Sequence, residues 1–115
     1  MAKLTLDTIK RLAPDSKSVS NAKSVADPRK WSALGIDEGG VLWGEYNGSE
    51  RYSLYASTSA PSSDSGCSCP SRKRPCKHVL GLLMLAAGGH PIETKAMPDY
   101  IRDEANEAYY ESTFE

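Results

Sequence analysis

The sequence predicts a small α+β domain in which short N-terminal helices precede a β-hairpin, a metal-binding loop and an α-helix. Three observations predict this class. The hydrophobic pattern changes from helical spacing to alternation after Trp31, three cysteines and a histidine cluster within residues 67–78, and an apolar helical pattern follows from Val79. The chain has 115 residues, which is the length of one small domain, so we expect one compact unit with tails.

Two short helices are predicted within the N-terminal segment, residues 1–29. Apolar residues at helical spacing predict the first over about residues 5–13, and Pro14 would end it. Apolar residues three or four apart predict a second helix, which Pro28 would end. The residues that carry these two patterns are Leu4, Ile9, Leu12, Val19, Ala22, Val25 and Ala26.

Two strands, Val41–Tyr46 and Arg51–Ser57, are predicted to form a hairpin around a turn at residues 47–48. Alternation places Trp43 and Tyr55 on the opposite faces from the other apolar residues of their strands. This aromatic pair either stacks on nucleic-acid bases or is covered by the N-terminal helices, and we favour the covered arrangement.

A polar loop and a helix are predicted on the two sides of the cysteine cluster. The stretch from Ser57 to Gly66 is rich in small polar residues and has no periodicity, which is typical of a mobile loop. After the cluster, Val79, Leu82, Leu83 and Ala86 share one helical stripe that we expect to pack on the hairpin, and two glycines at 88–89 would end this helix.

The charge is distributed unevenly, although the formal net charge is only −1. Residues 1–91 carry 12 Lys or Arg against 8 Asp or Glu, whereas residues 92–115 carry 2 against 7. A basic body therefore precedes an acidic C-terminal tail, residues 91–115, which either docks on the body as a helix from about Pro98 or stays free for a partner.

The composition also bears on the environment of the chain. No run of about 18 apolar residues occurs, and the N-terminus lacks the apolar segment of a secretory signal. An odd number of cysteines does not fit a closed disulfide framework. We therefore expect a soluble intracellular protein, cytoplasmic or associated with the nucleoid, without a membrane partner.

The cluster contains Cys67, Cys69, Cys76 and His78, which is a complete tetrahedral ligand set for zinc. Cys76 and His78 are too close in sequence to share one face of a helix, so Cys76 should precede the helix and His78 should lie in its first turn. Four protein ligands leave no position for a catalytic water. The sequence therefore predicts one structural Zn²⁺ and a small α+β zinc-binding domain.

The stretch CSCPSRKRPCKHVLGLLML resembles the CxCxnCxH pattern of the SWIM zinc-finger family, and all four ligand positions match. The preceding stretch KWSALGIDEGGVLWGEYNGSERYSLYAS is similar to the hairpin region of bacterial members. The resemblance implies a β-hairpin, a zinc loop and an α-helix in one finger domain, residues 30–90. It also implies an intracellular interaction module for DNA or for protein.

Two functions are compatible with these features. The first is weak, largely sequence-independent binding of nucleic acid, with DNA as the expected partner, through the basic zinc loop. The residues expected to contact nucleic acid are Arg72, Lys73, Arg74 and Lys77, with added contacts from Lys23, Arg29 and Lys30. The alternative is a protein–protein interaction subunit of a larger assembly, with a purely structural zinc and a partner bound through the acidic tail.

An enzyme is the least expected class. The sequence has no phosphate-binding loop and no arrangement of Ser, His and Asp that indicates nucleophilic catalysis. Of its two histidines, His78 belongs to the metal cluster and His90 lies in a predicted turn.

Overall fold

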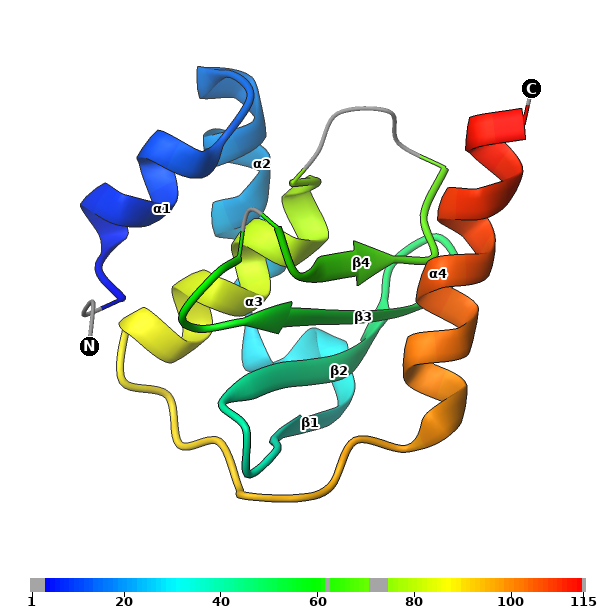
Figure 1. The fold of residues 1–115 in the computed structure, drawn as a ribbon. Coiled ribbons are helices and arrows are strands. Elements are labelled where there is room, and N and C mark those ends of the chain that lie inside the picture. Colours follow the sequence, from blue (N-terminus) through cyan, green and yellow to red (C-terminus); the bar gives the residue numbers. More distant parts are fainter. Residues whose placement is uncertain (1–3, 62, 71–74, 115) are drawn as a thin grey trace.

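A four-stranded antiparallel sheet forms the centre of the structure (Figure 1). The computed structural model describes residues 4–61, 63–70 and 75–114, and describes residues 107–114 by their backbone only. The strands follow the order β1-β2-β3-β4, and each strand pairs with its neighbours in sequence. They are β1 (Trp31–Ile36), β2 (Val41–Asn47), β3 (Arg51–Ser57) and β4 (Ser65–Cys67).

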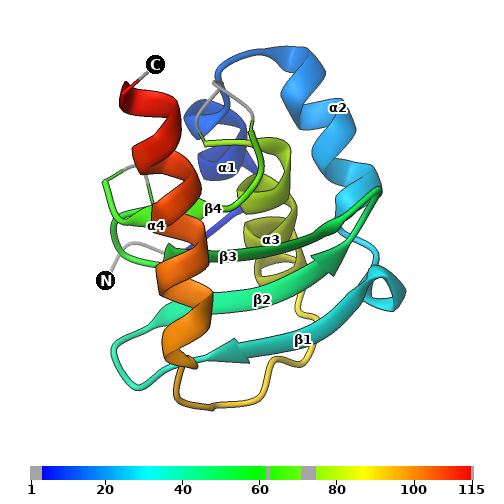
Figure 2. The same ribbon diagram turned by 90° about the vertical axis from the view of Figure 1, so that its right-hand side faces the viewer.

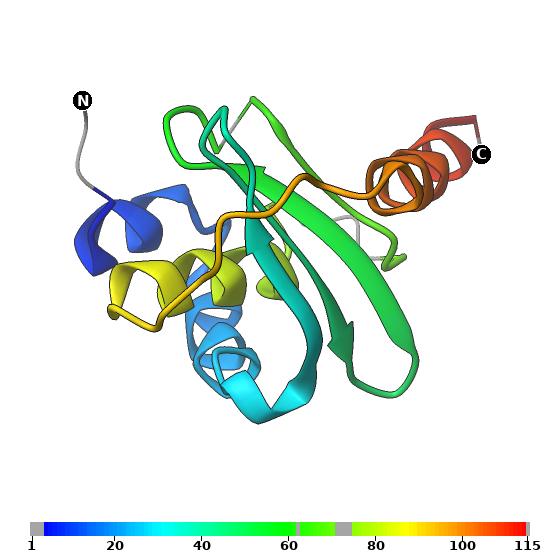
Figure 3. The ribbon, with the colours of Figure 1, turned by 90° about the horizontal axis from the view of Figure 1, so that it is seen from below.

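Helices cover both faces of this sheet. The helices are α1 (Leu6–Leu12), α2 (Ser16–Val25), α3 (Lys77–Ala87) and α4 (Asp99–Phe114), and a short 3-10 helix, η1, spans Pro28–Lys30. Seen from below, α3 lies between the sheet and the two N-terminal helices, and α4 lies alone on the other side (Figure 3). The order of layers is therefore α1 and α2, then α3, then the sheet, then α4.

Local sequence signals define the two N-terminal helices, which confirms both helix predictions. Thr5 precedes α1, and its hydroxyl oxygen accepts a hydrogen bond from the N–H of Thr8 at 3.2 Å. Asp15 precedes α2, and its carboxylate accepts one from the N–H of Ser18 at 2.7 Å. The same chemistry therefore begins both helices.

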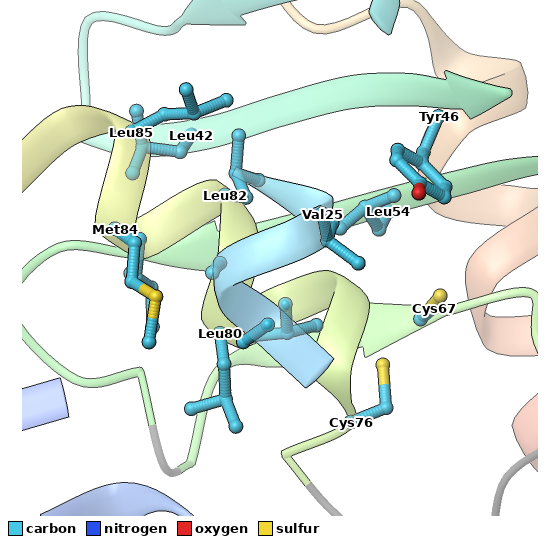
Figure 4. Packing of buried hydrophobic residues seen from close by; sticks show 14 of the residues in the cluster. Val25, Leu42, Tyr46, Leu54, Cys67, Cys76, Leu80, Leu82, Met84 and Leu85 are labelled. Carbon is cyan, nitrogen blue, oxygen red and sulfur yellow. The ribbon is translucent and has the colours of Figure 1, made fainter. Parts of the chain in front are cut away.

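The main core lies between α3 and the sheet (Figure 4). Leu42 and Leu54 of the sheet are almost fully buried against α3, and so are Leu80 and Leu82 of that helix. The prediction for α3 assumed one apolar stripe, but every residue from His78 to Leu85 is buried. Since α2 covers the side of α3 that faces away from the sheet, the helix is apolar on both sides.

The hairpin prediction is confirmed, but the sheet is larger than predicted. Residues 31–36 form β1, which pairs with β2, and Ser65–Cys67 forms β4 at the end of the predicted loop. The fold class nevertheless stands as predicted, a small α+β domain with a zinc-type cluster. Within the part of the chain that the structure describes, no helix combines the length and apolarity needed to cross a bilayer.

The second face of the sheet is covered by α4 (Figure 2). Trp43 and Tyr55 do lie on this face, and each is only 5% exposed, so neither ring is open to a base. They pack with Ile101 and Ala105 of α4. The expectation that N-terminal helices cover this pair is therefore wrong, because those helices pack on the opposite side of the sheet.

Polar contacts supplement the apolar docking of α4. The Tyr100 hydroxyl donates to the buried Glu45 carboxylate, and the Ser53 hydroxyl donates to Glu104 at 2.5 Å. The Tyr55 hydroxyl donates to the Asn106 side chain at 2.7 Å. Of the two arrangements considered for the acidic tail, the structure has the docked helix.

Candidate metal centre

The four predicted ligands come together from two parts of the fold. Cys67 is the last residue of β4, and Cys69 follows it after one residue. Cys76 lies at the N-cap of α3, and His78 lies in the first turn of that helix, as predicted. Figure 4 shows Cys67 and Cys76 at the edge of the main core, one from the sheet and one from the start of the helix.

The spacing of the ligand atoms fits zinc. The three sulfur atoms and one imidazole nitrogen all lie within 4.8 Å of one another. His78 Nδ1 is 3.7 Å from the sulfur of Cys67 and 3.9 Å from the sulfur of Cys76. Zn–S bonds of about 2.3 Å and Zn–N bonds of about 2.0 Å would place tetrahedral ligand atoms about 3.5 to 3.8 Å apart. The donor set therefore matches zinc in chemistry, number and spacing.

Electrostatics at the site favour a bound cation. The thiols of Cys69 and Cys76, together with burial, hold the pKa of Cys67 well above its ordinary value. For Cys76 the hydrogen bond with Cys67 lowers the pKa, but the Cys69 thiol and burial outweigh it and raise the pKa to about 11. Three adjacent buried thiolates are unfavourable without a positive charge between them, and Zn²⁺ supplies that charge when it binds.

The sheet holds the first ligand pair in place. Between the two cysteines, the N–H of Ser68 donates to the Ser53 carbonyl at 2.9 Å, and the Ser68 hydroxyl accepts from the Ser53 N–H at 2.9 Å. Both bonds lie just beyond the last β3–β4 pair, Leu54 with Cys67. They therefore extend the contact between these strands to the residue that separates the two ligands.

Two aromatic rings position the histidine. The Tyr46 ring lies 5.1 Å from the imidazole centroid of His78, and the Tyr52 ring lies 4.7 Å from it. Both tyrosines come from the hairpin, and His78 is only 5% exposed. Sequence reasoning placed these tyrosines in the strands but did not connect them with the metal site, because their contact with His78 depends on how α3 crosses the sheet.

Of the four basic residues predicted to contact nucleic acid, the structure describes one. Arg72, Lys73 and Arg74 lie outside the described residues, whereas Lys77 is exposed at the start of α3. The three residues proposed as added contacts are all exposed: Lys23, Arg29 and Lys30. Arg29 forms an ion pair with Asp27 at 3.1 Å, so its charge is partly compensated.

Comparison with known proteins supports the assignment of the site. A family model described as SWIM zinc finger matches residues 61–87, which span all four ligands and α3. A search of curated proteins finds no match, and a search of solved structures finds none either. Since the match starts after the hairpin, the similarity of the hairpin to bacterial members stays a prediction.

The four residues that the donor geometry brings together all lie within the range of the family match. The ligands of the site are Cys67, Cys69, Cys76 and His78, and the cofactor of the chain is one structural Zn²⁺. Residues 61–87, which are less than half of the chain, match the SWIM zinc-finger family model.

Proposed function

We propose that this chain is a nucleic-acid-binding module whose zinc finger presents a basic loop to phosphate groups. One observation carries the proposal. Cys69 and Cys76 converge on the same metal cluster, so the metal ties together both ends of the loop between them. The sequence of that loop contains Arg72, Lys73 and Arg74 and no acidic residue. Arginine and lysine at fixed loop ends are suited to contacts with phosphate oxygens.

The arrangement of charges supports the same proposal. Zn²⁺ with three thiolates carries a formal charge of −1, which reduces but does not cancel the four positive charges of residues 72–77. The acidic residues of α4 that the structure describes lie on the face of the sheet opposite α3, where the Ser53 hydroxyl donates a hydrogen bond to Glu104. The acidic tail therefore does not neutralise Lys77 through any described contact.

The expected binding is weak and depends on salt. Three or four phosphate contacts would give a slope of about −3 to −4 in a plot of log affinity against log salt for duplex DNA. The phosphate contacts carry no sequence information by themselves, so affinity should change little between sequences of the same length.

Fluorescence anisotropy with labelled DNA at several salt concentrations tests the proposal. We expect binding at low salt, and a large loss of affinity in the Arg72→Ala/Lys73→Ala/Arg74→Ala variant. A matched control is Lys10→Ala/Arg11→Ala/Lys95→Ala, which removes the same charge from exposed positions elsewhere. The proposal fails if the protein does not bind DNA at low salt, or if both triple variants bind equally well.

The alternative is a protein-interaction subunit with a purely structural zinc. The sequence argument for it relied on a free acidic tail, but Ile101 and Ala105 bury one side of that tail on the sheet. Less of the tail is therefore available to a partner than the sequence alone indicated. If DNA binding is absent while a partner is captured through the exposed side of α4, this alternative replaces the proposal.

We do not expect catalysis from the zinc site. All four tetrahedral positions are filled by protein side chains, so water or substrate has no open position on the metal. The expected activity is binding alone.

A further inference from the structure

A pocket of about 660 Å³ opens onto the metal centre, and three of the ligands, Cys69, Cys76 and His78, are among its lining residues. Its volume falls in the range of about 300 to 1,000 Å³ that is usual for small-ligand sites. Three separate parts of the chain form its walls: the first turns of α2, the turn between β2 and β3, and the two ends of the zinc loop. No signal in the sequence connects these three parts.

The walls of this pocket are basic. Lys17 lines it from α2, and Lys77 lines it from the start of α3. Among the described residues that line the pocket there is no Asp or Glu. The sequence of α2 also contains no acidic residue and offers Ser18 and Asn21 as further polar groups. The formal charge of −1 on Zn²⁺ with three thiolates offsets one of the two lysines, so the described walls keep a net charge of about +1, which suits an anionic ligand.

The pocket also has an aromatic surface. Tyr52 is half-buried and lines the pocket, and its ring packs on His78 with an angle of 32° between the two planes. Its hydroxyl bonds to the hydroxyl of Ser49 at 3.3 Å, which fixes the outer end of the ring. Because His78 packs on the Tyr52 ring, this side chain has little conformational freedom left to lose when a base stacks on it.

A glycine keeps this surface accessible. Gly48 lies in the turn above the two tyrosines, and a Cβ atom there would be 3.0 Å from the ring of Tyr46 and 3.6 Å from the ring of Tyr52. Any larger residue at this position would therefore occupy space next to the aromatic surface.

We propose that this pocket binds one unpaired nucleotide of a single-stranded nucleic acid, with its base on Tyr52 and its phosphates between Lys17 and Lys77. This inference rests on the proposed nucleic-acid-binding function and adds a preference for single strands. Bases within a duplex are stacked on each other and cannot enter a pocket, whereas unpaired bases can stack on aromatic side chains. A small inorganic anion would use the lysines but not the ring.

The test compares a labelled 12-nucleotide oligothymidylate with the same strand in a duplex, using zinc-loaded protein. We expect the single strand to bind more tightly than the duplex. Tyr52→Leu should weaken single-strand binding by about 5- to 100-fold, and Tyr52→Phe should keep most of it, because stacking needs the ring. Zinc content measured on each variant shows whether the metal site is intact.

Lys17→Gln provides a second variant, since Lys17 is exposed and makes no described contact with the metal ligands. We expect it to weaken binding and to reduce the salt slope by about 0.7, the value for one phosphate contact on a single strand. Lys95→Gln is the matched control. It removes the same charge from the segment along the bottom of Figure 1, whereas α2 begins near the top.

The outcomes separate this inference from the proposed function. If neither strand form binds at low salt, both fail. If the duplex binds as well as the single strand, or if Lys17→Gln behaves like Lys95→Gln, the pocket inference fails and the proposed function survives. If the oligonucleotide does not bind, but a labelled acidic peptide does and Lys17→Gln weakens its binding, the pocket belongs to a protein partner and the inference is wrong.

Discussion

Ser68 and Ser53 join the zinc loop to the sheet through two hydrogen bonds, each 2.9 Å long. One of them uses the side chain of Ser68 in place of a backbone carbonyl. The single residue between the first two zinc ligands therefore also joins the zinc loop to the sheet, which explains a polar side chain at this position.

Replacing this serine should destabilise the protein without removing the metal. In Ser68→Ala the N–H of Ser53 loses its partner, which costs about 1 to 2 kcal/mol in a partly buried position. Urea unfolding of the zinc-loaded protein measures this change. Ser20→Ala, on the exposed side of α2, is the control and should change stability by less than about 0.5 kcal/mol. Equal stability of the two variants would show that the Ser68 side-chain bond contributes nothing.

Gly81 should resist a substitution that usually stabilises helices. Alanine is favoured over glycine inside a helix by about 1 kcal/mol. At Gly81, however, a Cβ atom would lie 2.4 Å from Cγ1 of Val25 and 3.2 Å from the carbonyl oxygen of Ala22. Because α2 packs closely on α3 here, we expect Gly81→Ala to lower the free energy of unfolding by about 1 to 3 kcal/mol.

A double-mutant cycle with Val25→Ala checks the cause of this loss. Val25→Ala removes the atom closest to the new Cβ, Cγ1 at 2.4 Å, but keeps the Cβ of residue 25 at 2.7 Å. The relief is therefore partial, and the double variant should lose less stability than the sum of the single variants. Additive losses would mean that contact with Val25 is not the reason for glycine at position 81.

The docking of α4 should contribute substantially to stability. Ile101 is completely buried against the second face of the sheet, and Ile→Ala changes in such positions cost about 2 to 5 kcal/mol. Asp103→Ala is the control, since Asp103 is exposed on the same helix. Thermal unfolding should show a large drop in Tm for Ile101→Ala and a small change for the control. Similar Tm values for both variants would indicate that α4 is not held on the sheet in solution.

The sequence predicted the helices, the hairpin and the ligand set well, because each has a strong local signal. It did not predict β1, since Gly35 interrupts the alternation of that strand. Gly35 is required there by the Trp43 indole, which would be 2.4 Å from any Cβ atom at that position. This reason lies in the neighbouring strand and is not visible in β1 itself.

The other differences have similar causes. β4 contains only Ser65, Gly66 and Cys67, and Gly66 faces the Tyr55 ring, where a Cβ atom would be 2.9 Å away. The prediction that the N-terminal helices pack on Trp43 and Tyr55 was wrong. Both those helices and α4 carry apolar residues, so hydrophobicity alone does not show which of them packs on this face. The pocket beside the metal centre combines residues from three elements, so only the assembled fold reveals it.

A cysteine at position 78 should preserve the metal, whereas alanine should not. Zinc accepts four cysteines as readily as three cysteines and a histidine. We therefore expect one zinc per chain in His78→Cys, but a lower Tm, because the imidazole contacts with Tyr46 and Tyr52 are lost. His78→Ala should lose zinc to a chelator far more readily than the unchanged protein. Equal resistance to the chelator in His78→Ala would exclude His78 as a ligand.

We infer that the fold depends on one zinc ion bound by the four-residue cluster. Structural zinc contributes about 10 to 16 kcal/mol in finger peptides, which is comparable with or larger than the total stability of about 5 to 15 kcal/mol typical of a domain. The most direct measurement combines the zinc content of the purified protein, by mass spectrometry of the metal, with near-ultraviolet circular dichroism before and after chelation. We expect one zinc per chain, loss of the tertiary signal when the metal is removed, and its return when zinc is added back. A protein that contains no zinc, or that keeps the same tertiary signal and Tm after the metal is removed, would show that the fold does not depend on zinc.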